Sequence, residues 1–180
     1  MRRTGVSPDD TAVVVGTGMV GLLVVQVLRA YGCERVIGVD IDSGHLALAE
    51  NLGAETISGD AEGVATVVFE RTSGVGADLA IEVVGISHAV CTAIASVRKG
   101  RRGSLVGHLS PRIELPLQAV VTRELTLYGS CVSVGEYPEN IELLNSGKVD
   151  VEPLISALAP LSEGAGWFER LRSGAPGLMV

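Results

Sequence analysis

The sequence predicts an α/β protein built on a doubly wound, six-stranded parallel sheet, followed by a C-terminal helical and extended appendage. Short runs rich in Val and Ile alternate with segments that have the length and period of helices. The first run, Ala12-Val13-Val14-Val15, has no polar alternation, which is typical of a strand covered on both faces. Twenty-three glycines and only 3% aromatic residues indicate many tight turns around a core of Val, Ala and Leu.

The six strands and the helices between them follow in strict alternation. We expect strands at residues 12–15, 35–40, 54–57, 77–82, 103–106 and 125–128. We expect helices at residues 19–31, 43–52, 60–72, 87–97 and 116–122. Gly32 and Gly53 stand where the first two helices end, and Ser43 stands where the second would be capped. Because crossovers between parallel strands are right-handed, the doubly wound sheet is the commonest arrangement of such a pattern.

The chain changes character after Gly129. A helix at 138–146, a proline-bearing extended segment at 149–161 and a last helix at 162–172 are expected, and residues 177–180 resemble half a strand. We therefore divide the chain into a sheet domain at residues 1–134 and an appendage at residues 135–180.

Composition excludes several classes of protein. Among 180 residues, 14 Lys and Arg stand against 21 Asp and Glu, and this net charge of −7 argues against a nucleic-acid partner. With 47% hydrophobic and 19% charged residues, the chain is not disordered. The uncharged stretch at residues 11–28 is long enough to span a bilayer. Three glycines interrupt it, however, so it is better interpreted as a buried strand, a turn and a buried helix.

The three cysteines, Cys33, Cys91 and Cys131, are dispersed and form no CxxC pair. This usage fits buried free thiols in a reducing, cytoplasmic environment better than a disulfide framework. It also lacks the spacing of a zinc site.

The segment Gly16-Thr17-Gly18-Met19-Val20-Gly21 is a GxGxxG motif between the first strand and the first helix. In this motif Gly16 permits the tight turn, Gly18 lets the backbone approach a pyrophosphate, and Gly21 lets the helix pack closely on the strand. The phosphates would then lie on the free N–H groups at the positive end of the helix dipole. The motif therefore predicts a Rossmann-type dinucleotide site.

Asp40 ends the second strand, 19 residues after Gly21. A carboxylate there accepts hydrogen bonds from both ribose hydroxyls and repels a 2′-phosphate. Because no Arg or Lys occurs at residues 41–45, the pattern favours NAD over NADP. The alternative interpretation is a plain βα turn with Asp40 as a surface acid.

Other nucleotide-binding families fit less well. A P-loop needs GxxxxGK[ST], and neither Lys99 nor Lys148 lies in such a loop. The Tyr-x-x-x-Lys pair of short-chain dehydrogenases is absent, since Arg, Val and Ile follow the three tyrosines at that spacing. A methyltransferase would also carry an acid after its second strand, but it seldom keeps the third glycine.

At this level of detail the chain resembles the medium-chain dehydrogenases typified by zinc-dependent alcohol and polyol dehydrogenases, and looks closest to the sorbitol, butanediol and threonine dehydrogenase branch. The resemblance covers nearly the whole chain in order. It is carried by the segments VSPDD, GTGMVG, VDID, HLALAENLGA, GVGADLAIEVVG, SLVG, ELTLYGS and NSGKVDVEPLISALAPLSEG.

The resemblance implies a set of coenzyme-binding residues. The residues that match the family's coenzyme positions are Gly16, Gly18, Met19, Val20, Gly21, Asp40, Ile41, His45, Val84, Gly85, Val106, His108, Ser130 and Val132. Met19 and Val20 would lie under the pyrophosphate, and His45 would border the adenosine. The last four would hold the nicotinamide carboxamide through their backbone. His45 replaces a frequent Lys or Arg, and His108 replaces an apolar residue.

The resemblance also implies what this chain does not carry. Family members hold a catalytic zinc in a separate domain, and its GHE-type motif is absent here. We therefore expect no catalytic or metal-binding residue. From composition alone, His45, His88 and His108 are solvated loop or cap residues. Residues 1–134 would form the NAD-binding domain, and residues 135–180 would return to a missing catalytic domain.

Two functions follow as hypotheses. In the first, the chain is the NAD(H)-binding domain of a zinc-dependent alcohol or polyol dehydrogenase and presents nicotinamide for hydride transfer. In the second, it is a stand-alone module that senses NAD without turnover. A quinone reductase origin would favour NADPH, and Asp40 argues against it. We further expect a homo-oligomer that pairs near residues 113–117, and no membrane partner. Without the catalytic domain, apolar surface near Leu154-Ile155 and Trp167-Phe168 should be uncovered.

Overall fold

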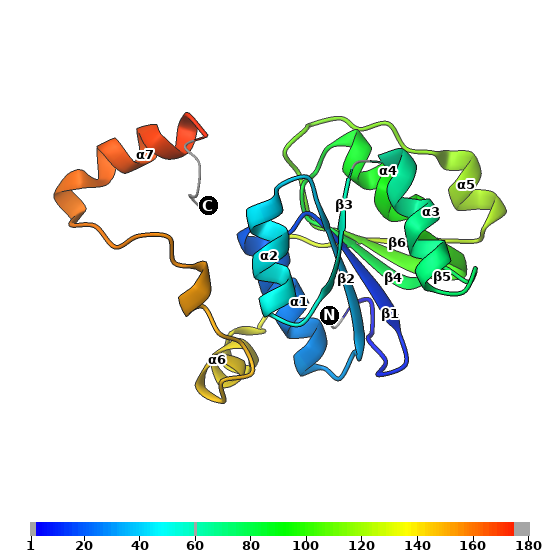
Figure 1. Cartoon of the computed structure of the whole chain (residues 1–180), viewed down its shortest axis with the longest axis horizontal. Helices are drawn as coiled ribbons and strands as arrows, with labels where there is room; N and C mark the ends of the chain where they lie inside the picture. The colour runs from blue at the N-terminus through cyan, green and yellow to red at the C-terminus, as the bar shows by residue number, and fades with distance from the viewer. Residues whose placement is uncertain (1–2, 60, 175–180) are drawn as a thin grey trace.

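A computed structural model describes residues 3–59 and 61–174, which form one parallel sheet with helices on both faces (Figure 1). Its strands are β1 (Thr11–Val15), β2 (Arg35–Asp40), β3 (Glu55–Ser58), β4 (Ala77–Glu82), β5 (Val97–Leu105) and β6 (Thr126–Gly129). They run in the order β3-β2-β1-β4-β5-β6, and every neighbouring pair is parallel. The predicted doubly wound sheet is confirmed.

Two apolar clusters hold the helices to the two faces of this sheet. The helices are α1 (Met19–Ala30), α2 (Ser43–Asn51), α3 (Ala61–Arg71), α4 (Ser87–Ser96) and α5 (Leu117–Thr122). Ala12 and Val14 of β1 belong to the cluster that contains α1 and α2 residues, while Val13 and Val15 belong to the cluster that contains α3 and α4 residues. This double coverage explains why β1 is apolar throughout.

The uncharged stretch at residues 11–28 forms β1, a glycine turn and most of α1, as expected. Within the described ranges, no helix is both long and apolar enough to cross a membrane.

The cap of α2 differs from the prediction. Asp42, not Ser43, is the N-cap residue, because its carboxylate accepts hydrogen bonds from the N–H groups of Gly44 at 2.8 Å and His45 at 3.0 Å. Both residue types are good caps, and sequence alone does not place the last extended residue between two candidates.

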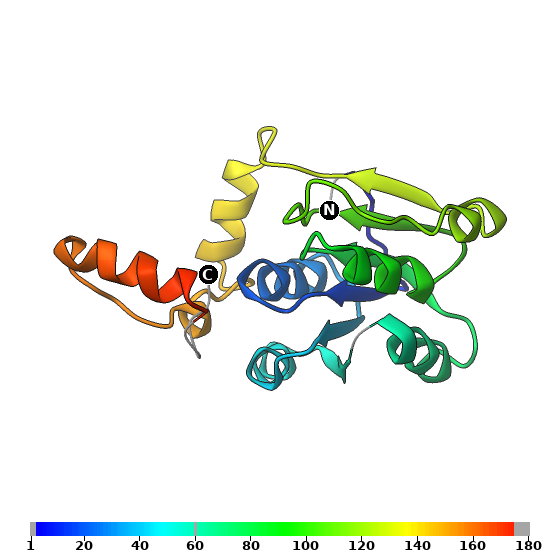
Figure 2. The same cartoon turned by 90° about the horizontal axis from the view of Figure 1, so that it is seen from above.

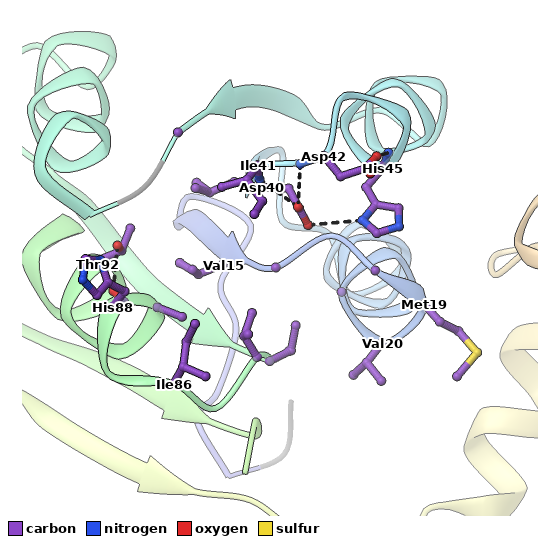
Figure 3. A pocket seen from close by; sticks show the side chains of 18 residues that line it. Val15, Met19, Val20, Asp40, Ile41, Asp42, His45, Ile86, His88 and Thr92 are labelled. Atoms are coloured by element: carbon purple, nitrogen blue, oxygen red, sulfur yellow. Dashed lines mark hydrogen bonds and ion pairs between the residues drawn. The ribbon is translucent and has the colours of Figure 1, made fainter. Parts of the chain in front are cut away.

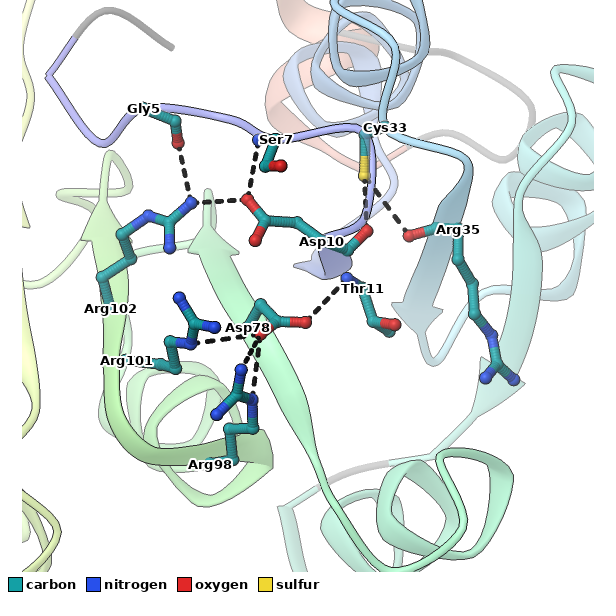
Figure 4. Close-up of polar contacts among 10 residues, drawn as sticks. All are labelled: Gly5, Ser7, Asp10, Thr11, Cys33, Arg35, Asp78, Arg98, Arg101 and Arg102. Carbon is teal, nitrogen blue, oxygen red and sulfur yellow. Dashed lines mark hydrogen bonds and ion pairs between the residues drawn. The ribbon is translucent and has the colours of Figure 1, made fainter.

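Strand β5 begins six residues earlier than the expected strand at 103–106, because a bulge interrupts its pairing with β4. The extra residues form the basic run that contains Arg98 and Arg101. Both guanidinium groups contact one Oδ1 atom of Asp78 on β4, at 2.7 Å and 3.2 Å (Figure 4). The other oxygen, Oδ2, accepts a hydrogen bond from the N–H of Thr11 at 3.0 Å. The buried carboxylate of Asp78 thus pairs with the two arginines at the start of β5. The hydrophobic pattern of the sequence could not indicate this ion pairing.

The C-terminal part comprises α6 (Tyr137–Asn145), short 3₁₀ turns at Glu152–Leu154 and Leu161–Glu163, and α7 (Gly164–Arg172). Residues 149–154 return to α1, where the Gln26 side chain donates to the carbonyl of Asp150 at 2.9 Å and accepts from its N–H at 2.6 Å. Leu154 joins the α1 cluster and is 7% exposed, so the expectation that it is uncovered is wrong, whereas Ile155 is 50% exposed, as expected.

Helix α7 lies away from the sheet in both views (Figures 1 and 2), and Phe168 is 77% exposed. The expected half-strand at 177–180 lies outside the described residues. The boundary between residues 134 and 135 stays a prediction. All three cysteines are free, but only Cys33 is buried; Cys91 is half-buried and Cys131 is exposed.

Candidate functional site

A cleft of about 520 Å³ opens at the carboxyl ends of the central strands. β1 and β4 are neighbours, and the helices that follow them, α1 and α4, cover opposite faces of the sheet. The chain therefore leaves a crevice at this switch point, where open α/β sheets bind their ligands. Figure 3 shows the side chains that surround it: Met19 and Val20 on α1, Asp40 at the end of β2, Ile41 and Asp42 after it, His45 on α2, and His88 and Thr92 on α4.

Each of the three glycines in the first turn is required, or tolerated, for a different structural reason. Gly16 has φ +92°, and a Cβ there would lie 2.5 Å from a methyl carbon of Val84. A Cβ on Gly21 would lie 1.9 Å from the carbonyl oxygen of Gly16. A Cβ on Gly18 would meet no atom within 4 Å. Contacts within the protein thus require glycine at positions 16 and 21. At position 18 they do not, and the absence of a side chain there leaves space in the cleft for a ligand.

The N-terminus of α1 is suited to an anion. Gly18 is its N-cap and supplies no side-chain hydrogen bond, and the first turn contains no acidic residue. The first N–H groups of a helix have no partner within the helix, and they carry the positive end of its dipole. This end of α1 faces the open space beside Gly18, so a pyrophosphate group fits it.

Asp40 is held by both turns that border the cleft. Its Oδ2 accepts hydrogen bonds from the N–H of Thr17 at 2.6 Å and from the Thr17 hydroxyl at 3.1 Å. Its Oδ1 accepts from the N–H groups of Ile41 at 2.8 Å and Asp42 at 2.9 Å. A carboxylate has about four lone-pair positions, and these donors fill them. The Thr17 hydroxyl can rotate away and leave a position for an incoming hydroxyl, whereas the backbone donors cannot.

The end of the cleft near Asp40 carries negative charge. Backbone hydrogen bonds from His45 and Gly44 hold the pKa of Asp42 below its usual range, so a second carboxylate stays charged beside Asp40. The His45 Nδ1 atom lies 3.6 Å from the Asp40 Oδ2 atom (Figure 3). Two neighbouring carboxylates disfavour a phosphate group at this end and are compatible with neutral hydroxyls.

The structure brings most of the predicted site residues together. The predicted residues that line the cleft are Gly16, Gly18, Met19, Val20, Gly21, Asp40, Ile41, His45 and Val84. Gly85 lies beside them in the loop after β4. Val106 and His108 lie in the loop after β5, and Ser130 and Val132 line a separate pocket of about 220 Å³ beyond β6. Their roles in binding stay predictions.

The sequence analysis missed half of the lining. The cleft residues that it did not propose are Val15, Val39, Asp42, Gly59, Val83, Ile86, His88, Ala89 and Thr92. The last three come from α4, which follows β4, and Ile86 is the residue just before this helix. The strand order would have identified these residues, because the pairing of β1 with β4 brings α4 to the cleft. His88 is exposed, as expected of a cap residue, but it also lines the cleft.

Glu82, the last residue of β4, is an unpredicted feature just below the cleft. It is fully buried, and its Oε1 accepts hydrogen bonds from the N–H groups of Val84 at 2.7 Å and Gly85 at 2.6 Å. Burial raises the pKa of this carboxyl group above its usual value. All six residues of β4 are buried, so no alternation of polar and apolar residues marks Glu82 at its end as a buried acid.

A search for metal ligands among residues 3–59 and 61–174 finds no group of three or more His, Cys, Asp or Glu residues that could hold an ion.

Comparison with known proteins decides the family. Residues 19–146 match the family model described as zinc-binding dehydrogenase. The chain belongs to this family. Among curated zinc-binding dehydrogenase relatives, a probable D-xylulose reductase A of Aspergillus niger is 33% identical over 97% of this chain and 50% of its own length. A sorbitol dehydrogenase of Arabidopsis thaliana is 32% identical over 86% of this chain and 44% of its own length.

Solved structures of alcohol dehydrogenases show the same fold. The alcohol dehydrogenase TADH from Thermus sp. ATN1 superposes with a TM-score of 0.87 and 29% identity, over 96% of this chain and 52% of its own. The chain thus spans about half the length of the curated relatives it matches. It corresponds to the NAD-binding half of zinc-type alcohol and polyol dehydrogenases, which confirms the resemblance seen in the sequence.

Proposed function

We propose that this chain binds NAD(H) and presents its nicotinamide ring for hydride transfer to or from an alcohol or polyol held in a separate catalytic domain. The observation that carries the proposal is the position of Asp40, which is fixed by backbone N–H groups at the adenosine end of a switch-point cleft. A surface acid without a ligand role would not need three backbone donors from two turns.

The residues present fit this coenzyme along the length of the cleft. The pyrophosphate would lie on the amides of α1 above Gly18, where a Cβ would meet no protein atom. The adenosine ribose would donate a hydroxyl to Asp40, at the position that the Thr17 hydroxyl can leave, beside Ile41 and His45. The nicotinamide would extend toward the loops after β5 and β6. When bound, NAD supplies the hydride acceptor, and this chain supplies binding and orientation.

The proposed reaction also needs a Lewis acid and a substrate site, which we assign to the catalytic domain. The relatives named above are reductases and dehydrogenases of polyols and alcohols, which supports an oxidoreductase function. We expect the 180-residue chain alone to bind the coenzyme without turnover.

We further propose that the chain pairs with a second copy in the cytoplasm. Ile113, Leu115 and Leu117 are 37%, 41% and 63% exposed in the segment that leads from β5 into α5. An exposed apolar segment favours association, and β6 adds an open sheet edge. The free thiols support a reducing compartment.

Calorimetric titration with NAD, NADP and AMP tests the proposed function. The wild-type chain should bind NAD more tightly than NADP. Asp40→Ala should weaken binding of NAD and AMP by about tenfold to a hundredfold, because hydrogen bonds to a charged group contribute about 1.5–3 kcal/mol. It should also remove the preference for NAD, because the repulsion of the 2′-phosphate is lost.

Glu55→Ala is the matched control, since it removes the same charge from the neighbouring strand β3 outside the cleft. It should leave the NAD-to-NADP ratio unchanged. Equal affinity of the wild-type chain for both coenzymes, or an unchanged ratio in Asp40→Ala, would contradict the proposal.

A further inference from the structure

Glu82 is a buried acid that the coenzyme cleft itself does not use. It is fully buried at the carboxyl end of β4 and does not line the cleft. Its Oε2 atom has no hydrogen-bond partner among the described residues. Buried carboxyl groups are rare unless their environment requires them, so this position needs an explanation.

Glu82 holds two loops at once. Its side-chain Oε1 accepts from the N–H groups of Val84 and Gly85, in the loop directly after β4. Its main-chain carbonyl accepts from the N–H groups of Val106 at 2.8 Å and Gly107 at 3.1 Å, in the loop directly after β5. One residue therefore accepts four hydrogen bonds from the two loops that lead from the sheet toward the nicotinamide end.

The two loops are also packed against each other without space for side chains. A Cβ on Gly85 would lie 2.2 Å from the backbone nitrogen of His108, and a Cβ on Gly107 would lie 2.1 Å from the backbone nitrogen of Gly85. The N–H of Ser110 donates to the carbonyl of Gly85 at 2.9 Å. Because the backbones touch, a displacement of the β4 loop displaces the β5 loop as well.

We propose that Glu82 is a positioning residue for the nicotinamide half of the coenzyme, acting through the loops at residues 84–85 and 106–108. The inference rests on the proposed NAD(H) binding. Val84 connects Glu82 to the coenzyme, because its N–H donates to the Glu82 carboxyl group and it also lines the cleft.

Glutamine should be able to replace this acid. Burial raises the pKa of Glu82, which favours the neutral carboxyl group. The side chain then acts through a carbonyl-type acceptor at Oε1, and a glutamine amide offers the same acceptor in the same shape. Methionine has a similar length but no such acceptor, so it leaves the Val84 and Gly85 N–H groups without a partner.

The test compares binding of NADH and ADP-ribose, which differ only by the nicotinamide group. Both ligands are titrated calorimetrically into the wild-type 180-residue chain, Glu82→Met and Glu82→Gln. The wild-type chain should bind NADH more tightly than ADP-ribose. Glu82→Met should reduce this NADH-to-ADP-ribose affinity ratio by about fivefold or more, as expected for a lost net hydrogen bond, and leave the ADP-ribose affinity within about twofold. Glu82→Gln should keep the wild-type ratio.

Asp78→Asn is the control for general damage to the strand. Asp78 lies at the opposite end of β4, is 9% exposed, and holds Arg98 and Arg101. This variant should lower the melting temperature without changing the ligand ratio. If Glu82→Met does not fold, Glu82→Asp replaces it, because its carboxyl group is one methylene shorter and cannot reach both N–H groups.

The outcomes separate the two proposals. A wild-type ratio near one, or an unchanged ratio in a folded Glu82→Met or Glu82→Asp chain, would overturn the role of Glu82 alone. Failure of the wild-type chain to bind either ligand would overturn the proposed function together with it.

Discussion

Thr17 of the first turn and two residues of β2, Gly38 and Asp40, fit closely together beside the cleft. Thr17 is fully buried, and its hydroxyl and N–H both contact Asp40. The Thr17 methyl carbon would lie 2.9 Å from a Cβ on Gly38, so β2 needs a glycine opposite it. The orientation of Asp40 therefore depends on two neighbours that touch no ligand.

The glycines at 18 and 21 should separate binding from stability. Gly21→Ala forces a Cβ against the carbonyl of Gly16 and should cost about 1–3 kcal/mol, which lowers the melting temperature by about 2–12 °C. Gly18→Ala meets no protein atom, and its φ of −67° suits alanine, so the chain should stay folded. The new methyl group should nevertheless weaken NAD binding by about tenfold or more, because it occupies the proposed path of the pyrophosphate.

Thermal melting and NAD titration of both variants check this prediction. An NAD affinity within about twofold of wild type in Gly18→Ala would argue against a pyrophosphate at this position.

Glu82 also predicts a pH dependence of stability. Its pKa is raised in the folded state, so the unfolded chain releases this proton first as the pH rises. The contribution of Glu82 to stability is therefore lost between the ordinary glutamate pKa of about 4.3 and the raised pKa. Glu82→Gln cannot titrate and should gain stability relative to wild type across this window. Denaturant unfolding at a series of pH values measures the difference, and parallel curves for the two proteins would contradict the prediction.

Among the elements, the segment after α6 is tied to the sheet domain by few contacts. Gln26 is 5% exposed on α1 and exchanges two hydrogen bonds with the backbone of Asp150. Val149 and Leu154 are buried on either side of this contact. Apolar burial and one side-chain bridge therefore anchor the segment that precedes α7.

Gln26→Ala should release this anchor locally. Loss of the bridge leaves the Asp150 N–H and carbonyl groups without their partner, which should cost about 1–2 kcal/mol and raise the opening equilibrium by a factor of about 5–30. Trypsin cleavage after Lys148, followed by mass spectrometry, should accelerate accordingly. Gln118→Ala on the exposed helix α5 is the control and should cleave at the wild-type rate. Equal rates in Gln26→Ala and wild type would show that the bridge does not hold the segment.

At the scale of the whole molecule, the segment between β5 and α5 exposes the apolar side chains of Ile113, Leu115 and Leu117. We expect a dimer in sedimentation equilibrium at micromolar concentration. The double variant Leu115→Lys and Leu117→Lys should shift the chain toward monomer, because two charges would face each other across a pair related by twofold symmetry. A wild-type chain that stays monomeric at high concentration would contradict the expectation.

Local patterns were sufficient for much of this protein. Unbroken apolar runs indicate strands covered on both faces, and glycine spacing with a strand-ending acid indicates the nucleotide turn. These signals depend only on residues close in sequence, which is why the elements, the doubly wound sheet and the positions of Gly16, Gly21 and Asp40 could be predicted.

Other features depend on which strands become neighbours, and only the tertiary structure decided them. β1 lies beside β4, which is more than sixty residues away in the chain, and this pairing brings Ile86, His88 and Thr92 to the cleft. The charged start of β5 pairs with Asp78 of β4, and Leu154 packs in the α1 cluster near the contact of Gln26 with Asp150. Glu82 is explained by two loops that meet above it. Long-range contacts of this kind leave no local pattern in the sequence, because each partner is ordinary among its own neighbours.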